Sequence, residues 1–160
     1  MLHGRRILSG VFLGIVFVGA FIQSGVPAAR AVERGTPAEA RALVAKAVRH
    51  IAEAGRDQAL EDFSDPKGAF VDRDLYIVVH DLTGRILAMP NPVLRGKDVS
   101  QLKDADGKLF VQQVLRVARE SGSGDVDFRW PNPMTQQIEA KTSYLQRVED
   151  LIVSCGSYRQ

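Results

Sequence analysis

Three side chains in the second half of the sequence have the chemistry to bind a small organic anion. Lys141 brings a cation into a strand-like segment that has no other cation before Arg147. Tyr144 follows three residues later, and its hydroxyl can donate a hydrogen bond. Trp130 ends an apolar strand face, where its ring can wall a cavity while the indole N–H donates one bond. Together they are consistent with a ligand pocket.

Strand geometry allows a second interpretation of the same residues. Side chains alternate between the two faces of a strand, so Lys141 and Tyr144 fall on opposite faces. Only a bulge or a strong twist near Lys141 would bring both to one pocket. Otherwise the lysine faces solvent opposite an acid, and the aromatic rings fill the core. Tyr76, which shares a strand face with Val78 and His80, has the same two interpretations.

Motifs of catalysis and of metal binding are missing from the sequence. There is no GxSxG, HExxH, Walker or GxGxxG pattern. Three histidines and one cysteine cannot make a usual zinc site, and residues 104–107 lack the spaced ligands of a calcium loop. His80 and Cys155 show no spacing that supports catalysis. We therefore predict that the protein is not an enzyme and holds no cofactor and no metal.

The N-terminal segment has the composition of a secretory signal peptide. A basic start precedes an apolar run at residues 7–22, and the small-x-small sequence Ala29-Arg30-Ala31 follows. The run is shorter than the roughly 20 residues that a spanning helix prefers. The sequence thus predicts a signal peptide at 1–31 and one domain at 32–160, in the periplasm or secreted. An uncleaved N-terminal anchor is the alternative.

Removal of that segment changes the charge of the protein. The full chain has 21 basic and 19 acidic residues and a net charge of +2. Three of the basic residues and none of the acidic ones lie in 1–31, which leaves 18 against 19, or −1. No basic cluster remains to neutralise phosphates, which argues against nucleic acid as a partner. Cys155 has no second cysteine to pair with, and its apolar surroundings predict a buried thiol.

Periodicity predicts the elements that must position these side chains. Thr36-Pro37-Ala38-Glu39 has the residues of a capping box, and the apolar positions behind it predict one amphipathic helix of about six turns. That helix is predicted to end within Leu60–Phe63. A hairpin at 75–89, a second helix from residue 110 and strands at 125–130, 138–148 and 151–158 follow. The order predicts an α+β fold with helices packed on one antiparallel sheet.

Several spaced motifs resemble the single Cache domain family of bacterial extracytoplasmic sensors, in a stand-alone form. They are LYIVVHDLTGRILAMPNPVLRGKDVSQLKDADGKLFVQQVL, then WPNP, AKTSYLQRV and VSCGSY, and they span roughly residues 36–158. The resemblance implies a PAS-like five-stranded antiparallel sheet with a long N-terminal helix and a second helix packed on it. It also implies a pocket on the concave face of the sheet for small carboxylates such as acetate, propionate, lactate or pyruvate.

The resemblance also implies which residues contact the ligand. It places Tyr76, Trp130, Lys141 and Tyr144 at pocket positions. Two more residues complete the predicted ligand-binding set: His80, on the strand face of Tyr76, and Met89, where the family often has a histidine. Lys141 would pair with the carboxylate, the two tyrosines would donate hydroxyl hydrogen bonds, and Trp130 would exclude water. Met89 removes a polar contact that the histidine would supply.

Two functions are compatible with these observations. The first is an extracytoplasmic, sensor-type domain that binds a small organic carboxylate and presents it to a membrane sensor partner. The second is a Cache-fold interaction or structural protein that docks a partner without binding a ligand. Met89 favours the second function, as does our expectation that the chain has no output domain of its own.

Processing of the N-terminal segment gives the first prediction. We expect cleavage after Ala31, because a small-x-small site follows an apolar run too short to span a membrane comfortably. N-terminal sequencing of the exported protein should therefore begin at Val32. A sequence that begins at Met1 would favour the anchor instead.

Overall fold

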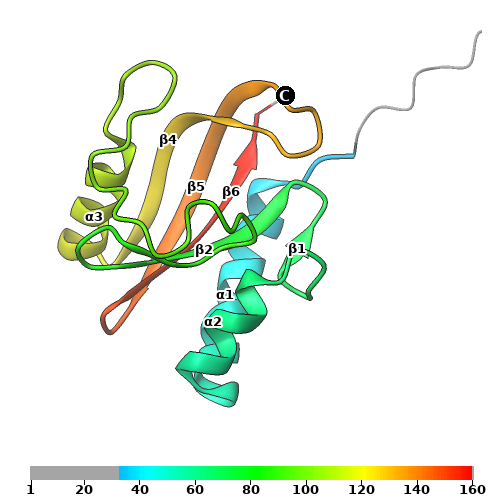
Figure 1. The fold of residues 1–160 in the computed structure, drawn as a ribbon, viewed down its shortest axis with the longest axis vertical. Helices are drawn as coiled ribbons and strands as arrows, with labels where there is room; N and C mark the ends of the chain where they lie inside the picture. The colour runs from blue at the N-terminus through cyan, green and yellow to red at the C-terminus, as the bar shows by residue number, and fades with distance from the viewer. Residues whose placement is uncertain (1–32, 160) are drawn as a thin grey trace, which may run out of the picture. The chain divides into compact units, whose positions relative to one another are not determined.

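Helices cover both faces of an antiparallel sheet in the computed structural model, which describes residues 33–159 (Figure 1). The predicted signal peptide, residues 1–31, lies outside the described residues. In chain order the elements are α1 (Pro37–Ala54), α2 (Arg56–Ser64), β1 (Val71–Asp72), β2 (Leu75–Asp81), β3 (Ile86–Ala88), α3 (Phe110–Glu120), β4 (Ser123–Pro131), β5 (Ile138–Val148) and β6 (Leu151–Tyr158). None of these helices is both long enough and apolar enough to cross a membrane.

The last strand in the sequence lies in the middle of the sheet. The strand order is β1-β2-β6-β5-β4 with antiparallel pairing, and β3 also pairs with β2. Because β2 and β5 flank it, β6 is buried along all eight residues. The predicted α+β class and its five strands are confirmed, and the two-residue β1 adds a sixth strand at the edge.

The N-terminal helix begins as predicted but is divided. The Thr36 hydroxyl accepts a hydrogen bond from the Glu39 N–H at 3.2 Å, and the Glu39 carboxylate accepts one from the Thr36 N–H at 2.7 Å. Gly55 then adopts a φ of 85°, which takes the backbone off the helical path between α1 and α2. The prediction of one continuous helix is therefore wrong, although α2 ends at Ser64, next to the predicted end.

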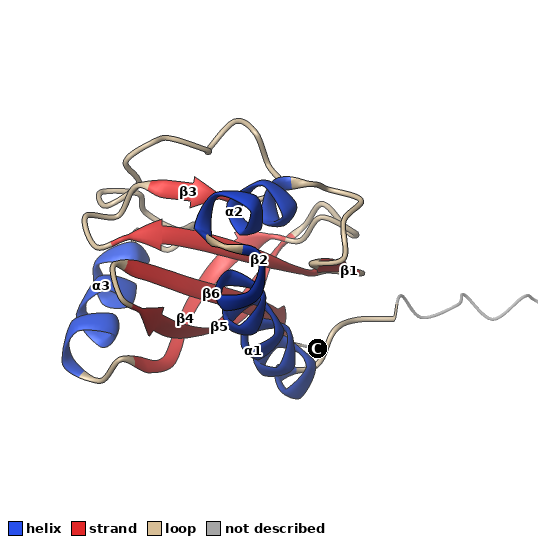
Figure 2. Cartoon of the chain, turned by 90° about the horizontal axis from the view of Figure 1, so that it is seen from below, coloured by secondary structure: helices blue, strands red, loops and turns tan. Residues whose placement is uncertain are grey.

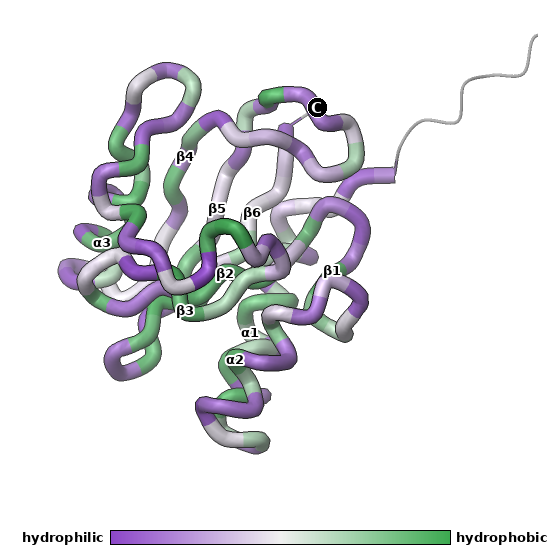
Figure 3. Tube along the Cα trace, viewed as in Figure 1, coloured by the Kyte–Doolittle hydropathy of each residue, from purple (hydrophilic) through white to green (hydrophobic). Residues whose placement is uncertain are grey.

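Alternation along the strands divides the core into two clusters. Leu75, Ile77 and Val79 of β2 join the apolar cluster beneath α1 and α2, while Tyr76 and Val78 pack against the cluster beneath α3. Figure 2 shows α1 and α2 together and α3 apart from them. Hydrophobic and hydrophilic residues alternate along α1 and α2, as expected for helices with one buried face (Figure 3). The two faces of the sheet thus have separate environments.

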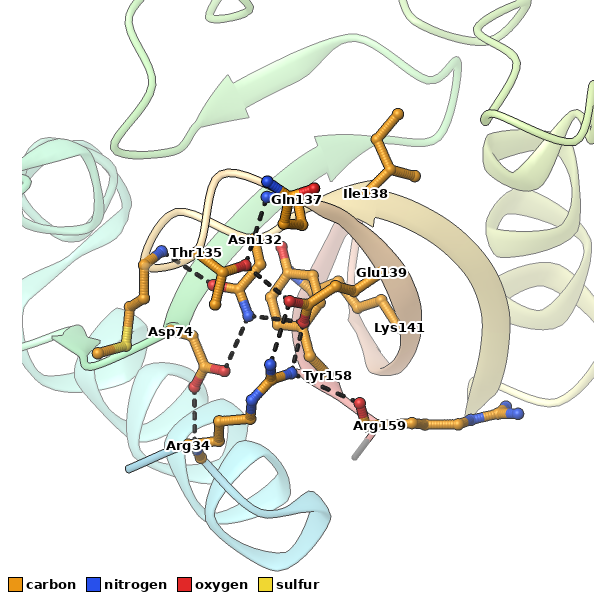
Figure 4. Close-up of polar contacts among 12 residues, drawn as sticks. Arg34, Asp74, Asn132, Thr135, Gln137, Ile138, Glu139, Lys141, Tyr158 and Arg159 are labelled. Atoms are coloured by element: carbon orange, nitrogen blue, oxygen red, sulfur yellow. Dashed lines mark hydrogen bonds and ion pairs between the residues drawn. The ribbon is translucent and has the colours of Figure 1, made fainter. Parts of the chain in front are cut away.

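A polar cluster around Glu139 fixes the segment before α1 to the loop between β4 and β5 (Figure 4). Arg34 forms an ion pair with the Glu139 carboxylate, and Thr135 and Asn132 donate to the same carboxylate at 2.6 and 3.0 Å. The hydrogen bond from Arg34, followed by those from Thr135 and Asn132, lowers the pKa of Glu139 to about 2. The carboxylate therefore stays ionised at neutral pH, and the cluster stays intact.

Asp74, just before β2, is the second carboxylate of this cluster. It is fully buried, accepts a hydrogen bond from the Gly35 N–H at 2.7 Å and lies 3.5 Å from the Asn132 amide nitrogen. Asn132 is itself only 1% exposed and accepts a bond from the Met134 N–H at 2.9 Å. Through these bonds the buried Asn132 amide connects the start of β2 with the proline-rich turn Pro131-Asn132-Pro133 between β4 and β5.

Cys155 gives the second prediction. It is 1% exposed, which confirms the predicted burial, and desolvation raises the pKa of its thiol to about 11. Since the thiolate is the reactive form, the folded protein should resist thiol-labelling reagents at pH 7.5 and react only when unfolded in denaturant. Rapid labelling without denaturant would contradict this placement.

Candidate ligand-binding site

A small cavity lies between the sheet and α3, on the face away from α1 and α2. Its volume is about 50 Å³. Residues of the sheet strands β2, β3, β4, β5 and β6 line it, together with residues of α3 and of the segment after β3. Apolar and aromatic side chains dominate the lining, and the polar ones include Tyr76, His80, Lys141 and Ser143. The cavity therefore combines an apolar surface with a few polar groups, as small-molecule sites do.

Lys141 is the charged residue of this cavity. It is 3% exposed, and its ammonium donates to the hydroxyls of Tyr76 at 3.0 Å and Tyr158 at 3.3 Å. The nitrogen also lies 4.1 and 4.5 Å from the centroids of the same two rings. Within residues 33–159 no carboxylate forms an ion pair with it. Among the described residues the buried ammonium thus has neutral hydrogen-bond partners and no ion-pair partner.

Regular pairing brings Lys141 to the cavity. It is opposite Phe128 of β4 and Tyr158 of β6, and the register on both sides of β5 runs without a shift. The predicted bulge is therefore wrong, and so is the alternative of a solvent-facing lysine. Gly156 makes room for the lysine stem, because a Cβ at this position would lie 2.2 Å from the Lys141 Cε. The lysine crosses β6 over a residue that has no side chain.

Tyr144 is not in the cavity, contrary to the sequence-based expectation. It pairs with Cys155 and packs into the cluster beneath α1 and α2, with the Arg41 guanidinium 4.2 Å above its ring. The period of two residues puts it on the opposite face from Lys141, and no irregularity of β5 changes that. Its predicted place beside the lysine is taken by Tyr158, which the sequence reasoning did not assign.

Tyr158 connects the cavity to the proline-rich turn. Its hydroxyl accepts from Lys141 and donates to the carbonyl of Pro131 at 2.7 Å. Burial raises the pKa of Tyr158, so the phenol stays neutral and keeps its proton for this bond. The sequence did contain a signal for this role of Tyr158. Gly156 and Tyr158 are two residues apart in the final strand, so they lie on one face of the sheet, and this is the face of Lys141.

Tyr76, His80, Met89 and Trp130, four of the predicted ligand-binding residues, all line the cavity. Trp130 belongs to an aromatic group in which the rings of Phe110 and Phe128 stack at 4.3 Å between centroids. β4 ends at Pro131, and the carbonyl of this residue holds Tyr158 beside the lysine.

His80 has an unusual environment within this cavity. It is 6% exposed, and its Nδ1 is buried without a hydrogen-bond partner among the described residues. Desolvation lowers the pKa of His80 to about 4, and the nearby charge of Asp81 offsets only part of this effect. The imidazole is therefore neutral at pH 7. Within residues 33–159 no group of three or more His, Cys, Asp or Glu side chains could hold a metal ion.

The fold, with a cavity between the sheet and α3, places the chain among PAS-like sensor domains. More specifically, the chain belongs to the family described as Single Cache domain 2, whose model matches residues 25–160. A solved periplasmic sensor domain of a chemotaxis protein is 30% identical, with a TM-score of 0.61, over 77% of this chain and 90% of that one. Family membership thus agrees with the motifs in the sequence and with a sensory class of domain.

Two further relatives give the family context. A solved structure described as the structural basis for carboxylic acid recognition by a Cache chemosensory domain is 28% identical, with a TM-score of 0.61, over 77% of this chain and 88% of that one. The methyl-accepting chemotaxis protein McpP of Pseudomonas putida (strain KT2440) is 35% identical over 95 residues, which are 59% of this chain. The matched part spans only 17% of McpP.

The buried His80 gives a pH-dependent prediction. In the unfolded chain its imidazole binds a proton near pH 6.5, whereas in the folded chain it does so only near pH 4. Between these values the unfolded state binds more protons, so the free energy of unfolding should fall as the pH falls from 6.5 to 4. The loss should be about 3 kcal/mol.

Urea denaturation at pH 7 and pH 4.5, without ligand, measures this effect. His80→Phe should lose less stability than the parent protein between the two pH values, because all other titratable groups are the same in both. An equal loss in both proteins would show that His80 does not carry the effect.

Proposed function

We propose that this domain is an extracytoplasmic sensor module that binds a small organic carboxylate in the cavity beside Lys141. The observation that carries the proposal is the buried ammonium with neutral partners only. Burying a charge away from water costs free energy unless it is paired, and hydroxyls and aromatic rings compensate only in part. A carboxylate would supply the missing negative charge and a charge-assisted hydrogen bond. Tyr76 would orient it through its hydroxyl, whereas the Tyr158 hydroxyl proton is already donated to the Pro131 carbonyl.

The size of the cavity favours a short acid. A water molecule needs about 10–15 Å³ in a cavity measured in this way, so about 50 Å³ corresponds to roughly three to five small atoms. Acetate and propionate, which have four and five non-hydrogen atoms, match this volume. The carboxylic acid recognition described for one similar Cache domain supports the same ligand class.

The partner and location belong to the same proposal. We infer a periplasmic domain, delivered by the segment 1–31 or anchored by it, that passes ligand occupancy to a membrane sensor. The chemotaxis proteins among its relatives support this context. An alternative function, docking of a partner without a ligand, is favoured by one observation. Met89 is 4% exposed and puts an apolar side chain into the cavity lining, which reduces its polarity.

Replacement of the lysine tests the proposal. Lys141→Met keeps the aliphatic stem over Gly156 and removes the charge, so binding of acetate or propionate should weaken by about 1.5–3 kcal/mol. Tyr144→Phe is the matched control, because it removes a tyrosine hydroxyl from the same strand on the opposite face. It should leave the affinity unchanged.

Isothermal titration calorimetry of the parent and the two variants measures these affinities, and thermal melting confirms that each is folded. A ligand that binds only the folded state must also raise the melting temperature of the parent. If no short carboxylate binds the parent, the docking function is favoured instead. If Lys141→Met binds as tightly as the parent, the assignment of the ammonium is wrong.

A further inference from the structure

A second hollow lies beside the cavity and shares part of its wall. Its volume is about 390 Å³. We call it the proline recess, and its lining residues include Val71, Arg73, Pro90, Asn91, Pro131 and Pro133. Tyr76, Met89 and Trp130 line both the proline recess and the cavity. These three side chains therefore form the partition between the two spaces.

Two members of this partition are fixed by other parts of the site. The Tyr76 hydroxyl accepts a hydrogen bond from the Lys141 ammonium at 3.0 Å. The Trp130 ring lies 5.4 and 6.2 Å from the ring centroids of Phe110 and Phe128. Replacement of either residue would therefore remove a contact that the cavity itself needs.

Met89 is the third member, and apolar packing holds it. It is 4% exposed and belongs to the apolar cluster beneath α3. Methionine is unbranched and fills irregular gaps between other side chains. Because Pro90 favours an extended backbone at residue 89 whatever side chain stands there, a shorter side chain should leave the path of the chain unchanged. Met89 is thus the part of the partition whose size can change while the rest of the site stays in place.

We propose that Met89 sets the upper length limit of the acids that the cavity accepts, because its side chain closes the cavity off from the proline recess. This inference rests on the proposed carboxylate-binding function and narrows its ligands to straight-chain acids no longer than propionate. The juxtaposition of two hollows across one methionine side chain carries it.

The partition lies near the cationic end of the cavity. Tyr76 bonds Lys141 and also lines the proline recess, so a carboxylate held by the ammonium has a residue of the partition next to it. The cavity of about 50 Å³ has room for roughly three to five small atoms. A longer acid therefore needs space beyond the cavity, and a shorter side chain at position 89 would open the way into the recess.

Another hollow also adjoins the cavity, and it suits an alkyl chain less well. It shares Phe128 and Lys141 with the cavity and has a volume of about 320 Å³. Its other lining residues are mostly charged, and they include Asp104, Asp106, Lys108, Asp127, Arg129 and Arg159. An alkyl chain placed there would take charged groups out of water without pairing them.

The proline recess offers an alkyl chain a more suitable surface. Among its described lining residues only Arg73 is charged, and Asp72 and Glu39 pair with that guanidinium at 2.8 and 2.7 Å. An acid that extends past residue 89 would therefore place its chain against proline rings and the partition side chains, where burial of apolar surface is favourable.

A series of straight-chain acids tests the limit on the exported protein. Calorimetry measures the affinities of acetate, propionate, butyrate, valerate and hexanoate for the parent and for Met89→Ala. The parent should bind butyrate about fivefold or more weakly than propionate, in the range that overfilling a packed space costs. In Met89→Ala each methylene beyond propionate should instead strengthen binding by up to about fourfold, the value for burying one such group.

Two further variants make the assignment specific. Met134→Ala is the matched control, because Met134 is 43% exposed and lines neither space, so this variant should keep the limit of the parent. Met89→Val shortens the side chain less and should bind butyrate at least as tightly as propionate, which tests the proposal even if Met89→Ala does not fold. Thermal melting confirms the folding of each variant.

The outcomes separate this inference from the function on which it rests. If the parent binds hexanoate as tightly as propionate, or if a folded Met89 variant keeps the limit of the parent, the role of Met89 is overturned and the carboxylate proposal stands. Failure of every acid to bind the parent would reject the proposed function itself.

Discussion

The burial of one ammonium group, that of Lys141, is the constraint on which the arrangement of this site depends. The Lys141 ammonium is only 3% exposed, so protein groups must accept the hydrogen bonds that water would otherwise accept. The hydroxyls of two tyrosines, which carry no charge of their own, accept them. One phenol comes from β2 and the other from β6, so the lysine holds two strands that are neighbours in the sheet. Gly156 is part of the same arrangement, because any side chain there would displace the lysine stem.

The hydrogen bonds of the lysine extend to the outer end of the sheet. Tyr158 donates onward to Pro131, and the next residue, Asn132, belongs to the polar cluster that holds the segment before α1. Glu139 of this cluster lies two residues before Lys141 on β5, and Asp74 lies two residues before Tyr76. Cavity and cluster are thus built on the same strand ends. The geometry of the cavity depends on a network of satisfied polar groups as well as on apolar packing.

Much of the fold could be predicted from local patterns. The capping box at Thr36, the hairpin at 75–89 and the alternation of β4 each reflect interactions between residues close in sequence, which propensity and period describe well. The break at Gly55 was missed because a single glycine within an apolar helical period does not by itself end a helix. Five of the six residues assigned by resemblance and strand face line the cavity, and they are Tyr76, His80, Met89, Trp130 and Lys141. Tyr144 was misplaced because the assignment overrode the period of two.

The sequence by itself determined the family, the class of fold and the opposite faces of Lys141 and Tyr144, because these depend on motif order and on a fixed strand period. Only the tertiary structure decided which of those faces is the cavity, since that depends on which helices cover each side of the sheet. It also decided that Tyr158 pairs with the lysine and that Gly156 gives the stem its path. Those contacts join strands through register, and register is a property of the assembled sheet that no single segment contains.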